Sequence, residues 1–104
     1  MAKNMNNLLK QAHQMQLKVT ALQKELESRE IEVSSGGGAI KITINGKQEI
    51  VKMKIEPECM DPTDVEMFET LIKTAINQAI KESQDMVSNA MSKVTGGLNI
   101  PGLF

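Results

Sequence analysis

Residues 5–26 read MNNLLKQAHQMQLKVTALQKEL. Apolar side chains recur there in alternating steps of three and four residues, at Met5, Leu8, Ala12, Met15, Val19, Leu22 and Leu26. Two apolar positions in seven form a heptad seam, which is typical of a helix that packs against another helix. At 1.5 Å per residue this helix would be about 33 Å long. We therefore predict that it projects from a small body and buries its seam against a second helix, from this chain or another copy.

The same stretch is basic. Residues 1–24 contain Lys3, Lys10, Lys18 and Lys24, and the first acidic residue is Glu25. Amide side chains on this helix include Asn6, Asn7, Gln11 and Gln14. A surface of ammonium groups and amide donors without carboxylates is suited to phosphates. From this feature alone, a solvated outer face is the simpler interpretation.

The composition sets further bounds. The 104 residues are 40% hydrophobic and 24% charged, as expected for one globular domain, which we place at residues 1–95 with a flexible tail at 96–104. Phe68 and Phe104 are the only aromatic residues, which argues against base-stacking modules. The net charge is −1, divided as +4 over residues 1–24, −2 over 25–60 and −3 over 61–104. A surface that binds polyanions is therefore expected on the first helix.

Export and membrane signals are missing from the sequence. Cys59 is the only cysteine, so an intrachain disulfide is excluded and a reducing cytoplasm is the expected setting. The N-terminus lacks the apolar core of a signal peptide, and no run approaches 18 apolar residues. We expect a cytoplasmic protein without a membrane partner.

Alternation of polar and apolar residues replaces the heptad after residue 29. Strands are predicted at 30–34, at Ala39–Ile44 and at about Lys47–Ile55. Gly36–Gly38 resembles a phosphate-binding loop only in composition, and a hairpin connection is the better interpretation because a strand follows. Asn45-Gly46 predicts a tight two-residue type I′ turn. The three strands would form an antiparallel meander.

The two faces of this meander differ. Ile40, Ile42 and Ile44 should share the apolar face with Val51, Met53 and Ile55. A second basic cluster, Lys41, Lys52 and Lys54, should lie on the opposite face, where solvated lysines are a usual device for keeping an exposed sheet soluble.

A second long helix should follow the sheet. Asp61-Pro62 predicts an N-cap with proline at the first helical position, and the helix should run to about Val94. A broad apolar stripe would cover the sheet, at Val65, Phe68, Leu71, Ile72, Ala75, Ile76, Ala79 and Ile80. The narrower distal stripe is expected to pair with the projecting first helix, and Gly96-Gly97 should end the second helix.

Catalytic chemistry finds little support. His13, the only histidine, is predicted to face outward, and Cys59 lies in a loop without a second thiol. Glu56 and Glu58 are more simply surface charges than an acid/base pair. We predict no enzyme, no cofactor, no metal and no small-molecule substrate.

Several segments form a distinctive series, namely residues 7–16 (NLLKQAHQMQ), 35–38 (SGGG), 40–46 (IKITING), 55–57 (IEP) and 75–79 (AINQA), with the glycine-rich tail. Together they resemble the YbaB/EbfC family of bacterial nucleoid-associated proteins. The resemblance covers nearly the whole chain. It implies an α+β fold with a long N-terminal helix, a three-stranded meander and a long C-terminal helix. It further implies a tweezer-like homodimer, joined through its sheets, that binds double-stranded DNA in the nucleoid without a cofactor.

The sequence is consistent with two functions. The first is a DNA-binding dimer with weak sequence preference that uses Lys3, Lys10, Lys18 and Lys24, aided by Asn6, Asn7, Gln11 and Gln14. The second is a protein-interaction or chaperone-like module resembling prefoldin, whose arm would offer Met5, Leu8, Leu9, Met15 and Leu17 to a client.

Overall fold

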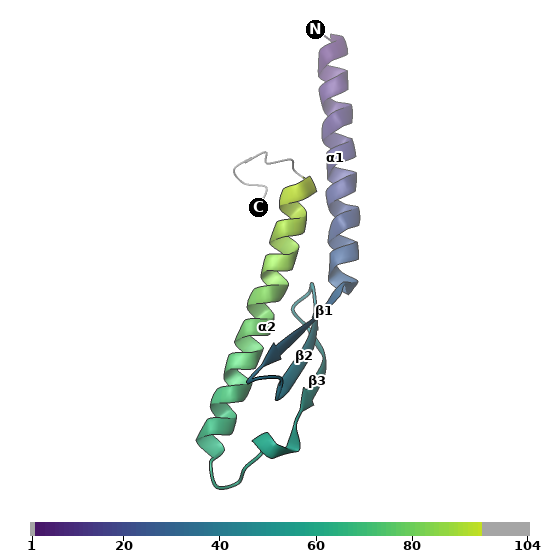
Figure 1. Ribbon diagram of the computed structural model, residues 1–104. Helices are drawn as coiled ribbons and strands as arrows, with labels where there is room; N and C mark the ends of the chain where they lie inside the picture. The colour runs from purple at the N-terminus through teal and green to yellow at the C-terminus, as the bar shows by residue number, and fades with distance from the viewer. Residues whose placement is uncertain (1, 95–104) are drawn as a thin grey trace.

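Two long helices and a small sheet make up the computed structural model, which describes the backbone of residues 2–94 and the side chains of residues 5–94. The element order is α1 (Ala2–Ser28), β1 (Glu30–Ser35), β2 (Ile40–Asn45), β3 (Ile50–Ile55), the short 3-10 helix η1 (Pro57–Cys59) and α2 (Val65–Val94). The molecule is elongated, measuring 75 × 22 × 16 Å. Figure 1 shows α1 extending well beyond the sheet and beyond the end of α2. The α+β fold expected from the sequence is confirmed. The predicted tail lies outside the described residues.

The exposure of α1 changes along its seam. Met5 and Leu8 are 63% and 62% exposed, whereas Leu26 is 1% exposed. Between them, Met15, Val19 and Leu22 are half-buried. The predicted projecting helix is thus confirmed, and within the described structure only the second half of its seam is covered by protein.

The core lies between α2 and the sheet. The strands are antiparallel in the order β1-β2-β3, as predicted. Ile40, Ile42 and Ile44 of the central strand are completely buried against Ala75 and Ala79 of α2. Two alanines one helical turn apart let the helix approach the sheet closely, so the branched isoleucines fill the space between them.

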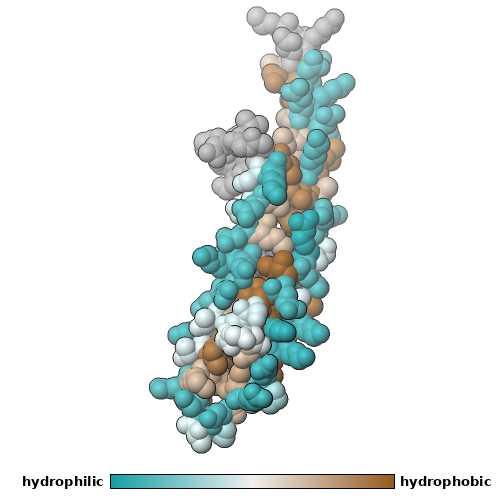
Figure 2. Space-filling view, viewed as in Figure 1, coloured by the Kyte–Doolittle hydropathy of each residue, from teal (hydrophilic) through white to brown (hydrophobic). Residues whose placement is uncertain are grey.

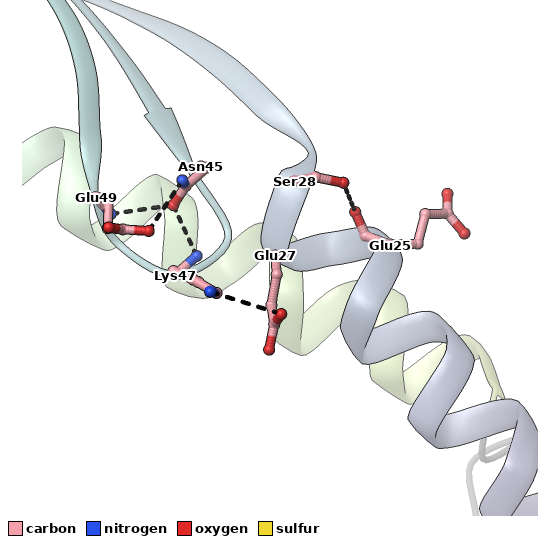
Figure 3. A network of polar contacts seen from close by, with 6 residues as sticks. All are labelled: Glu25, Glu27, Ser28, Asn45, Lys47 and Glu49. Atoms are coloured by element: carbon pink, nitrogen blue, oxygen red, sulfur yellow. Dashed lines mark hydrogen bonds and ion pairs between the residues drawn. The ribbon is translucent and has the colours of Figure 1, made fainter.

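The β2–β3 hairpin differs from the predicted two-residue turn. The left-handed residue is Gln48, with φ +63°, and the loop comprises residues 46–48. The Gln48 N–H donates to the Asn45 carbonyl (3.1 Å), while the Asn45 side-chain oxygen accepts from the N–H groups of Lys47 (2.9 Å) and Glu49 (3.1 Å). Figure 3 shows the contacts of Asn45 with Lys47 and Glu49. The asparagine stabilises a three-residue loop, and the type I′ prediction is wrong.

The longer loop shifts the register of β3. Met53 lies opposite Ile42 and Lys52 opposite Thr43, but Ile44 lies opposite Ile50, so the strand is irregular at Val51. The strict alternation predicted for β3 is therefore interrupted, and the strand begins at Ile50 instead of about Lys47. Val51 is the extra residue of β3, and the residues before it no longer follow the predicted alternation of faces.

Gly46 is required by a close backbone approach. A methyl group on Gly46 would lie 2.0 Å from the carbonyl oxygen of Leu26, at the end of α1. The glycine lets the β2–β3 loop abut the base of α1, and nearby Lys47 Nζ lies 3.9 Å from a carboxylate oxygen of Glu27 (Figure 3).

We expect Gly46→Ala to lower the free energy of unfolding by about 3 kcal/mol, because backbone atoms on both sides must move apart. Gly37→Ala is the matched control. Gly37 has φ +69° but no atom near the added methyl group, so only the backbone cost of about 1 kcal/mol applies. Urea unfolding measures the free energy of unfolding of both variants. A loss for Gly46→Ala that is equal to or smaller than the loss for Gly37→Ala would contradict the steric explanation.

The start of α2 also differs from the prediction. The helix begins at Val65, and its cap is Asp64, whose side chain accepts from the N–H of Met67 (3.1 Å). Pro62 precedes the helix in a turn that Asp61 stabilises. The hydroxyl and backbone N–H of Thr63 donate to the Asp61 carboxylate and hold its pKa below the ordinary value.

The distal half of α2 packs against α1, as predicted. Met91 is 7% exposed there, and Met86, Val87, Ala90 and Val94 are half-buried. At the base of this contact, the fully buried Ser83 hydroxyl donates to the Asn45 carbonyl (2.7 Å). The hairpin is therefore held to α2 through Ser83 and against α1 through Gly46.

Candidate nucleic-acid interface

The basic face of α1 is open to solvent. Lys10, Lys18 and Lys24 are exposed, and none takes part in an ion pair among the residues with described side chains. Lys10 and Lys24 share the outward heptad position and Lys18 lies beside it, so the helical period places the three on one side of α1. Their ammonium groups are available to an external anion.

The first acidic residues that follow this face in the sequence are partly neutralised. Glu25 is paired with Arg29 one turn further along, and Glu27 faces Lys47 of the hairpin loop. Both carboxylates lie at the base of α1, beyond the last of the three lysines. Residues 5–24, which contain no acid, thus keep a positive potential although the whole chain has a net charge of −1.

The predicted amide residues lie on the same helix. Asn6, Asn7, Gln11 and Gln14 are all exposed. A shallow depression on α1 brings together Asn6, Asn7, Lys10 and Gln14, but it does not include Gln11, Lys18 or Lys24. Lys3 falls within α1, but its side chain lies outside the described set. The predicted residues therefore form an extended surface instead of one pocket.

Two residues of this depression were missed as site residues from the sequence. Leu9 and His13 line it beside Lys10. Both are exposed and lie one turn apart on α1. The signal was present, since His13 is three residues after Lys10 and four after Leu9, but neither residue type by itself indicates phosphate contact.

The structure brings together no catalytic pair from the residues considered above. His13 is exposed on α1, while Cys59 is buried in η1, near the opposite end of the molecule. Over the described chain, no three histidine, cysteine or acidic residues are grouped as metal ligands. Neither α1 nor α2, as far as they are described, has a stretch both long and apolar enough to cross a bilayer.

A second candidate surface lies along the edge strand β3. Ile50, Val51 and Met53 are 41%, 52% and 37% exposed. The helix α2 packs on β2 and β1, and leaves these side chains uncovered. The other edge strand, β1, instead exposes Glu30 and Glu32. Among the three strands, exposed large apolar side chains are thus confined to β3, where they stand beside the exposed Lys52 and Lys54.

Comparison with known proteins identifies relatives of this chain. Residues 1–98 match the YbaB/EbfC DNA-binding family. A nucleoid-associated protein of Clostridium kluyveri is 52% identical over 101 residues, covering 97% of this chain and 89% of that protein. One from Alkaliphilus metalliredigens is 50% identical, covering 99% of this chain and 90% of that protein.

A solved structure has a similar fold. The crystal structure of the uncharacterized protein HP0035 from Helicobacter pylori superposes with a TM-score of 0.71, at 21% identity, over 86% of this chain and 94% of that one. The match over residues 1–98, together with relatives of about half-identical sequence, identifies the chain as a member of the YbaB/EbfC DNA-binding family.

Proposed function

We propose that this protein is a nucleoid-associated homodimer that binds double-stranded DNA through the basic faces of its two α1 helices. The observation that carries the proposal is the surface of residues 5–24, which exposes Lys10, Lys18 and Lys24 and contains no carboxylate. Family membership supports DNA as the polyanion. The proposed function needs no catalysis and no cofactor, and it places the protein with the DNA in the cytoplasm.

The proposed contacts are made mainly to the DNA backbone. Lys10 and Lys24 are separated by about 21 Å along α1. Because phosphates repeat every 3.4 Å along one strand, this span covers about six nucleotides. Lys3 would extend the surface toward the N-terminus, and Asn6, Asn7, Gln11 and Gln14 would donate to phosphate or sugar oxygens. Contacts of this kind position a protein on a duplex without reading its sequence, so weak sequence preference follows.

The proposed dimer joins the β3 edges of two copies. Ile50, Val51 and Met53 lie uncovered on an edge strand whose outer hydrogen-bonding groups can pair with a second strand. Joining the sheets in this way would leave α1 of each subunit projecting from a common body. Two arms double the number of lysines that reach the duplex.

Substitution of one lysine tests whether α1 contacts phosphates. We expect Lys18→Gln to reduce the slope of log K against log salt by about 1.8 per dimer, since each lost phosphate contact contributes about 0.9. Lys81→Gln, an exposed lysine on α2, removes the same charge outside α1 and should leave the slope unchanged. Fluorescence anisotropy of a labelled duplex measures both, and equal slopes for the two variants would count against α1.

The exposed apolar side chains of α1 favour a second candidate function. Met5, Leu8, Leu9 and Leu17 are each more than half exposed. A prefoldin-like module would use such an arm to hold an unfolded client. Suppression of the aggregation of a denatured client, without affinity for duplex DNA in low salt, would favour this candidate over the nucleoid function.

A further inference from the structure

The heptad seam of α1 continues past the end of its partner helix. Leu26 and Ser83 both adjoin the β2–β3 loop, through Gly46 and Asn45 respectively. Figure 1 shows that α1 and α2 extend side by side from this level, with opposite chain directions. The same number of residues separates Leu26 from Met15 and Ser83 from Val94. Val94 therefore lies close to the level of Met15, about 16 Å above the loop.

Burial along the two helices agrees with this register. Met15, Val19 and Leu22 of α1 are half-buried, as are Val94, Ala90 and Val87 of α2 at the corresponding levels. Above Met15 the exposure rises, and Met5 and Leu8 are 63% and 62% exposed. Figure 2 shows hydrophobic surface along the junction of the two helices, bordered by hydrophilic residues on either side. The exposed part of the seam, Met5, Leu8 and Ala12, continues this junction.

We propose that residues 95–104 of the same chain cover this exposed part of the α1 seam. The segment follows Val94 directly, at the level where the protein cover of the seam ends. It reads TGGLNIPGLF, with four large apolar side chains, Leu98, Ile100, Leu103 and Phe104, and no charged side chain. An uncharged apolar segment suits an apolar strip that begins beside its attachment point.

The length of the segment fits the strip. Met5 lies about 15 Å beyond Met15 along the helix axis. Ten residues in an extended conformation span at most about 33 Å, so the segment can reach Met5 with slack. Gly96, Gly97 and Pro101 disfavour a helical continuation of α2. In an extended chain, alternate residues such as Leu98 and Ile100 lie about 7 Å apart on one side, close to the step of about 5 Å between successive seam positions.

A second copy of the chain is a poorer occupant. Helices that pair between chains as a coiled coil use three to four heptads of seam. Among the seam residues with described side chains, Met5, Leu8 and Ala12 alone remain exposed, which is less than two heptads. The cover also leaves the proposed DNA surface free, because Lys10 lies on the side of α1 away from the seam. The inference does not depend on DNA binding.

A single fluorophore tests the docking directly. The chain has no tryptophan and no tyrosine, so Phe104→Trp introduces one emitter at the end of the segment. We expect its emission to be blue-shifted relative to a peptide of residues 95–104 carrying the same tryptophan. When Met5→Gln and Leu8→Gln are added to the Phe104→Trp variant, its emission should return to that of the peptide.

The matched control is Leu9→Gln with Leu17→Gln, which removes two apolar side chains of similar exposure that lie off the seam. It should leave the blue shift unchanged. If the Phe104→Trp variant without further substitutions emits at the wavelength of the free peptide, the proposal is overturned. A blue shift that disappears on dilution, as the mass of the particle falls, would assign the strip to another copy and would also overturn it.

Hydrogen exchange tests the same contact without a reporter. Removing residues 96–104 should speed amide exchange of residues 8–12 at least 10-fold and leave residues 19–26 unchanged, since α2 covers the latter. Unchanged exchange at residues 8–12 would contradict the docking. The mass of the shortened protein, measured by light scattering, should equal that of the full chain apart from the residues removed.

Discussion

Reversing three charges on α1 is expected to abolish DNA binding. We expect the variant Lys10→Glu, Lys18→Glu, Lys24→Glu to lose at least about 100-fold in affinity for a duplex at low salt, because each dimer exchanges six phosphate contacts for six repulsions. The three side chains are exposed and make no ion pair in the described structure, so their replacement breaks no ion pair there. Fluorescence anisotropy measures the loss, and circular dichroism should remain helical.

The control carries the same change of net charge elsewhere. Lys41→Glu, Lys73→Glu, Lys81→Glu replaces exposed lysines on β2 and α2 that are likewise outside the described ion pairs. Salt screens the attraction between phosphates and lysines that lie far from them. The affinity of this variant for the duplex should therefore stay within about 10-fold of that of the natural chain. Equal losses in the two variants would show that only the overall charge matters, and they would remove α1 as the interface.

The second large effect concerns the β3 edge. We expect Val51→Asp with Met53→Asp to convert a particle of about twice the 11.4 kDa chain mass into a monomer. Each apolar side chain buried at the interface contributes about 1.5 kcal/mol or more, and a buried unpaired carboxylate costs further energy. The dissociation constant of the dimer should therefore rise at least about 100-fold. Light scattering or sedimentation across a dilution series measures the change.

An equally exposed apolar pair elsewhere provides the comparison. Met60→Asp with Met67→Asp alters side chains that are 49% and 45% exposed near the start of α2. This variant should keep the mass of the dimer. If it dissociates and the β3 variant does not, the interface lies near the start of α2 instead of at the sheet edge.

Much of the architecture was predictable because it follows from local periodicity. The alternation of two in β2 places its isoleucines on the buried face, and the alternation of three and four along α1 places Met15, Val19, Leu22 and Leu26 on the side that α2 and the hairpin cover. Ile40, Ile42 and Ile44 show this most clearly, as all three are fully buried.

The connections were less predictable because contacts from distant residues decide them. Asn45-Gly46 is typical of a type I′ turn, but Gly46 here meets the end of α1, and the left-handed position moves to Gln48. The register shift at Val51 follows from that longer loop. Asp61 and Asp64 are both plausible caps by residue type, and only the path of the chain into α2 selects Asp64.

For the candidate site, residue type and helical spacing indicated the basic face. The sequence did not show that Lys10, Lys18 and Lys24 would stay outside ion pairs while Glu25 and Glu27 found cationic partners. The partner of Glu27 is Lys47, twenty residues away in a hairpin loop. The sequence also did not predict the exposed β3 edge, because its exposure depends on where α2 crosses the sheet.

Titration of a labelled duplex with the full chain at several salt concentrations, with light scattering on the same samples, is the most direct test of the proposed function. We expect saturable binding by a particle of twice the chain mass. We also expect a slope of log K against log salt of roughly −5 to −7, as six to eight lysines require. A dimer that does not bind DNA at low salt would contradict the proposed function, as would binding with a slope near zero.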